Sequence, residues 1–150
     1  MAEEKKAEQE FQIQRIFLKD LSFETPIGAE AFFTQHQPSV NQELATQSRK
    51  IDETHYEVML KLTVTATAED KTVFLVEIQQ AGIFYISGID EENIPRILNT
   101  VCPQVLFPYA RETIDNVLNK GTFPGLMLAP INFDALFNQA QANKEEASKH

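Results

Sequence analysis

One strictly patterned segment constrains the fold of this chain more than any other. From Tyr56 to Thr67, apolar and polar residues alternate, broken only by the apolar Met59. Successive side chains of a β-strand point to opposite faces, so the segment predicts a strand with one buried face. The buried set is Tyr56, Val58, Leu60, Leu62, Val64 and Ala66, and the opposite set is Glu57, Lys61, Thr63, Thr65 and Thr67. Such a strand needs a sheet and a second layer to cover it.

Further strands are predicted on both sides of this one. The first is Phe11–Glu24, ended by Pro26 and Gly28, with Phe11, Ile13, Phe17, Leu21 and Phe23 on one face. Glu69-Asp70-Lys71 predicts a hairpin turn, after which Val73–Gln80 forms a third strand and Ile83–Ile89, beyond Gly82, a fourth. The short connections indicate antiparallel pairing. Residues 29–50 show weak periodicity and predict a long connection, with one helical turn around Ala31–Phe33.

The apolar period becomes helical after the last predicted strand. A first helix carries Ile94, Ile97, Leu98 and Val101 and is expected to end at Pro103. A second is expected to begin near Pro108, to carry Ala110, Ile114, Val117 and Leu118, and to end at Gly121. Asn132 is expected to cap a last helix that carries Phe133, Leu136, Phe137 and Ala140. Strands followed by helices predict an α+β fold.

The length and the two polar ends define the predicted domain. A chain of 150 residues fits one domain. Residues 1–10 and 142–150 are polar and without apolar pattern, so both are expected to be disordered. The single folded domain is therefore predicted to span residues 11–141.

Charge and cysteine content exclude several classes of function. The net charge of −9 argues against nucleic acid and against anionic membrane surfaces as partners. No apolar run approaches the roughly 18 residues that a membrane-spanning helix needs, and the first residues lack the apolar stretch of a signal peptide. Cys102 is the only cysteine, so it has no intrachain disulfide partner. These features together predict a cytoplasmic protein without membrane insertion.

No set of residues in the sequence has the pattern of a catalytic or metal site. The histidines His36, His55 and His150 have no metal-ligand spacing. Cys102 lies next to Pro103 with no partner motif, and a buried structural thiol is the favoured interpretation. Glu112 and Asp115 share a helix face, which solvent or an interface explains. We therefore predict that the chain is not an enzyme and uses neither a cofactor nor a metal.

Two surface features call for an explanation. On the strand after the hairpin, Leu75 and Glu77 are predicted to point away from the core, and so are Asp20 and Glu24 on the first strand, which suggests a docking patch. The apolar segment Val105–Tyr109 lies at an expected junction between elements, so it is either buried at an interface or part of a binding groove. The 11 phenylalanines permit both interpretations, a core or a groove lined with rings, and composition favours the core.

Several long strings of residues resemble SecB, the bacterial protein-export chaperone family. They are Phe11–Ile16, Gln79–Phe84, Leu106–Glu112, Gly121–Pro124 and Leu128–Phe137. The likeness extends in one order from Phe11 to Phe137. The chain departs from the family pattern where His36 replaces the usual Trp, where Gln42 replaces an apolar residue, and where Ala140 and Gln141 replace larger apolar residues.

The resemblance implies a four-stranded antiparallel sheet followed by helices packed on one face, assembled as a dimer of dimers. It also implies that unfolded precursor proteins bind in hydrophobic grooves and are delivered to the motor ATPase SecA, without ATP or metal. The residues that match the family's SecA contacts are Asp20, Glu24, Leu75 and Glu77. The residues that match its client groove are Val40, Leu44, Leu106, Phe107, Tyr109, Thr113, Asn116 and Phe137.

The chain is also expected to be a homotetramer on physical grounds. One sheet with a single helical layer leaves Leu106, Phe107 and the helix stripe Ile114, Val117 and Leu118 with little to pack against. Two other functions remain open: a SecB-like chaperone dedicated to one cytoplasmic partner, and a structural scaffold that binds no clients. A small-molecule enzyme is disfavoured because no site is visible.

Overall fold

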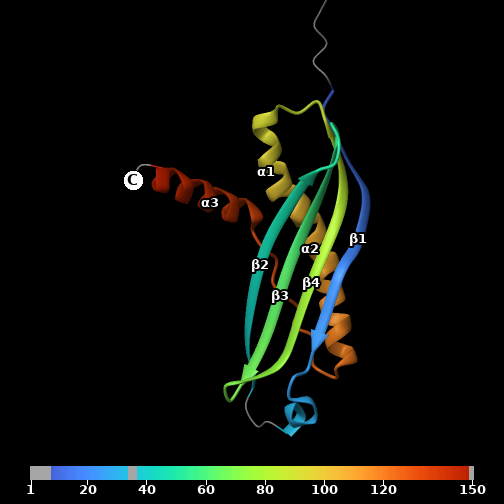
Figure 1. The fold of residues 1–150 in the computed structure, drawn as a ribbon, viewed down its shortest axis with the longest axis vertical. Coiled ribbons are helices and arrows are strands. Elements are labelled where there is room, and N and C mark those ends of the chain that lie inside the picture. Colours follow the sequence, from blue (N-terminus) through green and yellow to red (C-terminus); the bar gives the residue numbers. More distant parts are fainter. Residues whose placement is uncertain (1–7, 34–36, 149–150) are drawn as a thin grey trace, which may run out of the picture.

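The structure, a computed structural model, describes residues 8–33 and 37–148 as one antiparallel sheet with helices on one side (Figure 1). The strands are β1 (Glu10–Glu24), β2 (Ser39–Lys50), β3 (His55–Ala68) and β4 (Lys71–Ser87), in the order β1-β4-β3-β2. A short helix, η1 (Gly28–Phe33), lies between β1 and β2. After β4 come η2 (Glu91–Asn93), α1 (Ile94–Asn99), α2 (Val101–Lys120) and α3 (Phe133–Ser148). This confirms the predicted α+β class, with strands first and helices after.

The central hairpin of β3 and β4 matches the alternation in the sequence. All six residues predicted to point inward, from Tyr56 to Ala66, are buried. The turn consists of Glu69 and Asp70, which both have positive φ angles, 51° and 61°. Two successive residues with positive φ form the turn whose twist fits a tight hairpin. The predicted turn is therefore confirmed.

The two strands predicted at Val73–Gln80 and Ile83–Ile89 are wrong as separate elements, because β4 runs unbroken through Gly82. The glycine marks a close approach, since a Cβ atom there would lie 3.0 Å from the backbone oxygen of Arg15 and 3.1 Å from Leu106 Cδ2. Glycine inside a strand often marks a place where another part of the chain approaches closely, and Gly82 is such a place and not a turn.

The predicted long connection over residues 29–50 is also wrong in its second half. The helical turn around Ala31–Phe33 is confirmed as part of η1, but β2 follows from Ser39 and pairs with β3 along its whole length, from Ser39↔Thr67 to Lys50↔Tyr56. As an edge strand, β2 gains its hydrogen bonds from β3 and buries few side chains; only Leu44 and Thr46 are half-buried. An edge strand of this kind leaves little alternation in the sequence.

The first strand, β1, contains two irregularities, and one of its residues consequently lies on the other face of the sheet from the one predicted. The register with β4 shifts between Ile13 and Arg15 and again between Leu18 and Asp20. A β-bulge moves the following residues to the opposite face. Phe17 consequently lies opposite Ala81, on the face of the sheet without helices, rather than with Phe11 and Leu21 as predicted.

Two predicted helix boundaries are wrong because the prolines do not break the helices there. The helix expected to end at Pro103 is replaced by α1, which ends at Asn99, and by α2, which begins at Val101 and contains Pro108. Pro103 falls in the first turn of α2, where the missing N–H costs nothing. The segment Val105–Tyr109 is therefore helical and is not a junction. The predicted end of α2 next to Gly121 is confirmed.

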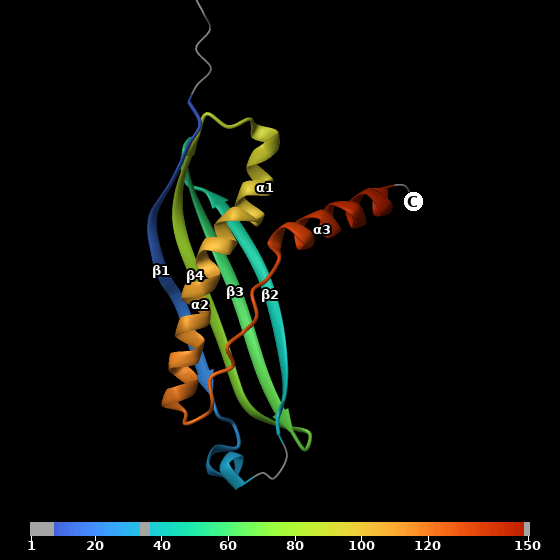
Figure 2. The ribbon, with the colours of Figure 1, turned by 180° about the vertical axis from the view of Figure 1, so that it is seen from behind.

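The core lies between α2 and the face of the sheet that it covers, here called the inner face (Figure 2). From α2, Leu106, Ala110, Ile114 and Leu118 are fully buried, and from the sheet Leu60, Leu62, Val76 and Ile78 are. The opposite face of the sheet, here called the open face, carries no helix (Figure 1). The stripe Ile114, Val117 and Leu118 and the pair Leu106 and Phe107 are thus already packed within one chain, which removes the reason given above for a tetramer.

The last helix begins as predicted and ends later. Asn132 caps α3, with its side-chain oxygen 3.0 Å from the backbone nitrogen of Ala135. From there α3 projects away from the sheet (Figures 1 and 2). It runs on to Ser148, so residues 142–148 are helical in the structure and not disordered as predicted. The predicted N-terminal segment, 1–10, lies mostly outside the described residues.

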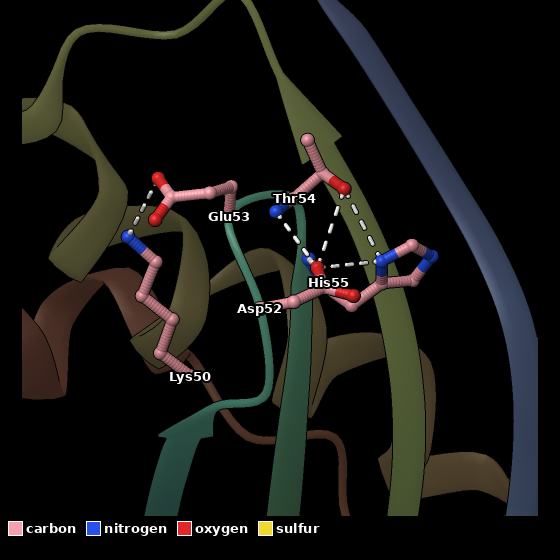
Figure 3. A network of polar contacts seen from close by, with 5 residues as sticks. All are labelled: Lys50, Asp52, Glu53, Thr54 and His55. Atoms are coloured by element: carbon pink, nitrogen blue, oxygen red, sulfur yellow. Dashed lines mark hydrogen bonds and ion pairs between the residues drawn. The ribbon is translucent and has the colours of Figure 1, made fainter.

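The connection between β2 and β3 is held by one carboxylate (Figure 3). The backbone N–H groups of Thr54 and His55 donate to Asp52 Oδ1 at 2.9 and 2.8 Å, and His55 Nδ1 lies 2.8 Å from the same oxygen. The pKa of the Asp52 carboxyl therefore falls from 3.8 to about 2, mainly through the Thr54 N–H and then through the His55 side chain. Hydrogen bonds to the charged form favour ionisation.

We predict that Asp52→Asn destabilises the fold at neutral pH and that the difference from wild type disappears in acid. The folded-state pKa lies below that of the unfolded chain, so the ionised carboxylate stabilises the fold fully above about pH 5. This stabilisation is lost as the pH falls through about 2. The measurement is the denaturant midpoint between pH 7 and pH 2. Glu53→Gln, which removes an exposed carboxylate from the same turn, is the control and should change little.

Candidate functional site: two grooves and an open sheet face

The larger groove lies where η1, β2, β4 and the chain after α2 meet. We call it the aromatic groove. Its volume is about 470 Å³, and its lining includes Phe32, Val40, Phe74 and Phe123. The ring of Phe123 stacks on Phe32 at 5.4 Å and lies 5.1 Å from Phe74. Phe32 and Val40 are 55% and 45% exposed, so apolar surface is open to solvent here. Concave apolar surface of this size suits an apolar side chain of a partner.

One wall of the aromatic groove is held in place by α2. The backbone N–H of Leu126, which lines the groove, donates to Asp115 Oδ1 at 3.1 Å. Arg111 Nη1 donates to the carbonyl oxygen of Leu128 at 3.4 Å. Asp115, for which the sequence left solvent or an interface as explanations, therefore positions the chain between α2 and α3. Gly121 permits the Phe23 ring to pack closely against the backbone at the end of α2, because a Cβ at this position would lie 2.8 Å from Phe23 Cζ.

The second groove lies between β2, α1 and α3, and we call it the helix groove. Its volume is about 280 Å³. Its lining is Leu44, Ala45, Thr46, Asn99, Phe133, Leu136, Phe137 and Ala140. Leu136 is 47% exposed and Phe137 is half-buried, so α3 brings apolar side chains to the groove without burying them fully. Both grooves border β2, which α2 does not cover.

The structure divides the predicted client residues among several places. Val40 lines the aromatic groove, whereas Leu44 and Phe137 line the helix groove. Leu106 and Phe107 are buried in the core, and the Phe107 ring packs against Phe133 at 6.3 Å. The resemblance implied that Leu106 and Phe107 line a client groove, but neither residue lines the aromatic groove or the helix groove, because both are buried in the core. They can support the grooves but do not line them.

Three further predicted residues form a stripe on α2. Tyr109 is 50% exposed, and Thr113 and Asn116 follow it at helical spacing on the same face. Thr113 Oγ1 donates to the carbonyl oxygen of Tyr109 at 3.0 Å, and Asn116 Nδ2 donates to Glu112 Oε1 at 2.5 Å. The stripe lines neither groove, so the structure does not join it to Val40 or Leu44.

The four residues predicted to form the acidic docking patch lie together on the open face. Across the sheet Glu24 pairs with Leu75, Ser22 with Glu77, and Asp20 with Gln79. Cross-strand partners point to the same face, so Asp20, Glu24, Leu75 and Glu77 share one surface. Leu75 and Glu77 are half-buried, while Asp20 and Glu24 are exposed. Lys61 Nζ lies 3.5 Å from Glu77 Oε1 and neutralises part of this charge.

Positive charge lies farther along the open face. Lys19 Nζ is 3.0 Å and Arg49 Nε is 3.8 Å from Glu57 Oε1, so cations from both edge strands meet one carboxylate on β3. Glu57 is the best buried of the three side chains, with 14% exposed. The acidic patch is thus one part of an unevenly charged face.

Rings at the aromatic groove were missed by sequence reasoning. Phe32 and Phe123 come from segments that show no regular pattern, and Phe74 looked like an ordinary core residue. The only signal was the number of phenylalanines, 11 in the chain, which allowed a groove without locating it. The placement depends on contacts between segments far apart in the sequence.

Neither a cluster of metal ligands nor a helix able to span a membrane occurs among the described residues. No group of three or more His, Cys, Asp or Glu side chains that could hold a metal ion occurs in residues 8–33 and 37–148. His55 contacts Asp52 and Tyr85, whereas His36 and His150 lie outside the described residues. None of the helices in the described segments is long and apolar enough to cross a membrane.

Comparison with known proteins gives a consistent result. A family model described as "Preprotein translocase subunit SecB" matches residues 4–144. A protein named "Protein-export protein SecB" from Cellvibrio japonicus is 53% identical over 140 residues, which cover 93% of this chain and 84% of the relative. Proteins of the same name from Saccharophagus degradans and Hahella chejuensis are 54% and 47% identical, covering 94% and 93% of this chain and 84% and 92% of their own.

A solved structure has the same fold. It is a SecB-like chaperone from Mycobacterium tuberculosis in complex with a ChAD peptide from the HigA1 antitoxin. The TM-score is 0.65, and the match covers 81% of this chain and 91% of that chain. At 16% sequence identity, the likeness shows the fold alone.

We predict that Cys102 does not react with thiol reagents in the native state. A position in the first turn of a helix favours the thiolate, but burial of Cys102 on the side of α2 that packs into the core prevails and raises the pKa of this thiol to about 12. The measurement is the rate of reaction with Ellman's reagent, which should be at least about a hundredfold slower in the native protein than in guanidinium chloride. An Ala142→Cys variant, with a second thiol at an exposed position of α3, should react at one thiol without denaturant. Rapid reaction of the wild-type protein would mean that α2 leaves the sheet readily.

Proposed function

The chain belongs to the SecB family of protein-export chaperones, and from this premise we propose that it holds unfolded precursor proteins in its apolar grooves without using ATP. The observation that carries the proposal is the pair of open grooves along β2, with exposed apolar side chains at Val40, Phe32 and Leu136. Because a chaperone of this family acts by binding, the chain is not an enzyme. No cofactor or metal is required.

Binding alone is sufficient for this activity. A protein that binds unfolded chains and not folded ones shifts the client away from folding by mass action. Folded clients have buried the apolar side chains that the grooves would accept, whereas unfolded clients present them. The selectivity therefore comes from the state of the client and needs no particular sequence.

We further propose that the acidic part of the open face docks SecA. The support is geometric: Asp20, Glu24, Leu75 and Glu77 lie on one surface, away from both grooves. A half-buried leucine among carboxylates suits a partner surface with an apolar centre and a positive rim. With clients on the inner face, SecA could bind a loaded chaperone without competing for the same surface.

The dimer of dimers is likewise proposed, on a different surface from the one that the sequence suggested. On β1, Phe11, Ile13, Leu18 and Leu21 lie opposite inner-face residues of β4 but are 36–46% exposed. A row of exposed apolar residues along an edge strand is a surface that a second copy of the chain can cover. Four linked protomers would also bind one long client with added avidity.

The cellular setting completes the proposal. A single buried Cys102 fits a reducing compartment, and we place the chain in the cytoplasm. The net charge of −9 disfavours nucleic acid as a partner. A chaperone dedicated to one cytoplasmic partner would have the same grooves, and a scaffold would not need them. Identification of the proteins bound to the chain in cells separates these possibilities, because an export chaperone should carry mainly secretory precursors.

We predict that single alanine substitutions in either groove, or in the exposed stripe on α2, weaken client binding. Val40→Ala tests the aromatic groove, Phe137→Ala the helix groove and Tyr109→Ala the stripe on α2. Each should raise the Kd for an unfolded client by about three- to tenfold, in keeping with the loss of a partly buried apolar side chain. The measurement is calorimetric titration with reduced, carboxymethylated α-lactalbumin.

The control for this experiment is Gln104→Ala, an exposed position of α2 that lines neither groove. Circular dichroism and light scattering check that the fold and the oligomer are kept. Unchanged affinity in Val40→Ala and Phe137→Ala would show that clients bind elsewhere. Unchanged affinity in Tyr109→Ala alone would remove only the α2 stripe from the site.

We predict that Leu75→Gln and Glu77→Lys weaken binding to purified SecA while client binding is kept. The substitutions change the apolar centre and the charge of the open face, and neither residue lines a groove. Glu43→Lys is the matched control, since it makes the same charge change on the same face but on β2, at the other edge of the sheet. The charge effect should decrease as salt rises, because exposed charges are screened within about 8 Å at physiological ionic strength. Equal loss in Glu43→Lys would indicate a general electrostatic effect and no patch.

A further inference from the structure

One arginine of α1 contacts three residues of α3. Arg96 Nη2 donates to Asn138 Oδ1 at 3.0 Å, and Arg96 Nη1 lies 3.9 Å from Asp134 Oδ1. The guanidinium carbon also lies 4.7 Å from the centre of the Phe137 ring. Asp134, Phe137 and Asn138 follow one another at helical spacing and form one side of α3. A single side chain therefore binds about one turn of the helix.

The rest of α3 has few attachments to the body of the protein. Its first residue, Phe133, is buried and packs against Phe107. Leu136 and every residue from Asn138 to Ser148 are exposed, and the helix projects from the sheet (Figures 1 and 2). A helix anchored at its first residue can pivot there unless a second contact fixes its direction. Arg96 supplies such a contact.

The same turn of α3 forms the outer wall of the helix groove. Phe137, on which the Arg96 guanidinium stacks, lines the groove together with Leu136 and Ala140. We propose that Arg96 is a positioning residue that holds α3 as a wall of the helix groove and so keeps that groove ready for a client. This inference rests on the proposed function, because it assumes that clients use the helix groove.

The contact depends on the shape of the guanidinium as well as on its charge. The Arg96 and Asp134 side chains are 51% and 65% exposed, and an ion pair as exposed as this contributes little. Stacking on Phe137 with simultaneous donation to Asn138 needs a planar group with several donors, which lysine lacks. Arg96→Lys should therefore keep the charge and lose most of the positioning.

Loss of the contact should weaken client binding through the population of the competent groove. When a site is formed in only a fraction of the molecules, the apparent Kd rises by the inverse of that fraction. With Arg96 removed, α3 samples other directions and the wall must be re-formed when the client binds. The direct contacts between the client and Phe137 stay available, so binding is reduced and not abolished.

The test combines the mobility of α3 with client affinity. A nitroxide label on Ala142→Cys reports the motion of α3 from a residue that does not line the groove, and the buried Cys102 does not compete for the label. The label is placed in the otherwise wild-type chain and in the variants Arg96→Ala and Arg96→Lys. Lys144→Ala, which removes an exposed cation from the same helix, is the matched control. Client affinity is measured on the unlabelled proteins with reduced, carboxymethylated α-lactalbumin.

We expect Arg96→Ala to mobilise the label and to raise the client Kd about fivefold, with Arg96→Lys close to it and Lys144→Ala equal to wild type. The combination of Arg96→Ala with Phe137→Ala should add little to Phe137→Ala alone, whereas the combination with Val40→Ala should be additive. Additivity of Arg96→Ala with Phe137→Ala would overturn the proposal, because Arg96 would then act elsewhere.

Two further outcomes would also overturn it. In one, Arg96→Ala leaves the label as immobile as in wild type. In the other, the label becomes mobile while client affinity stays at the wild-type value. Both concern Arg96 alone and leave the proposed function standing as long as the wild-type protein binds the unfolded client. A wild-type protein that does not bind this client would contradict the proposed function itself.

Discussion

The packing of α2 on the inner face of the sheet is the contact on which the remaining features depend. It buries Leu106, Ile114 and Leu118 against β3 and β4, and each such side chain contributes about 1.5–3 kcal/mol when it leaves water. The helix covers the two central strands and leaves β2 largely uncovered. Apolar surface therefore remains open beside β2, and both grooves lie there, one toward η1 and one toward α3. The residues that hold the fold together are consequently different from those that face solvent in the grooves.

Sequence reasoning predicted an element correctly where one of its faces is buried. It failed where strand pairing or a local backbone contact determines the structure. The alternation in β3 gave its inward residues correctly, because each of them meets the core. The edge strand β2 escaped notice, because its hydrogen bonds to β3 do not depend on its side chains. Gly82 and Pro103 were interpreted as interruptions, although the first permits a close approach within β4 and the second fits the first turn of α2. A glycine or a proline in a sequence therefore indicates a local constraint on the backbone, but it does not indicate whether the constraint is a turn, a close approach or a position in the first turn of a helix.

The same distinction explains how far the candidate site could be predicted. Alternation along β1 and β4 predicted from the sequence that Asp20, Glu24, Leu75 and Glu77 point away from the core. The pairing and register of the two strands, which the structure supplies, bring the four residues together on one face. The grooves join segments distant in the sequence, such as Phe32 with Phe123 and Leu44 with Phe137, and no periodicity reports such contacts. Resemblance to the family supplied several groove residues but also Leu106 and Phe107, which are buried in the core. Those two act on the grooves only by fixing α2.

The two faces of the sheet give the proposed chaperone a physical basis for transfer without ATP. Clients and SecA would bind opposite surfaces, so the binding of one does not sterically displace the other. A ligand shifts an equilibrium only through different affinities for two states, and the resulting coupling between two binding sites is reciprocal. If docking of SecA changes the affinity for clients, a bound client changes the affinity for SecA by the same factor. The elements that could carry such coupling are β3 and β4. On the inner face their side chains form the core under α2, and on the open face they include Glu77 and its neighbours. A small change in the twist of this hairpin would reach both surfaces at once, whereas α3, attached through Phe133 and Arg96, would respond only at the helix groove.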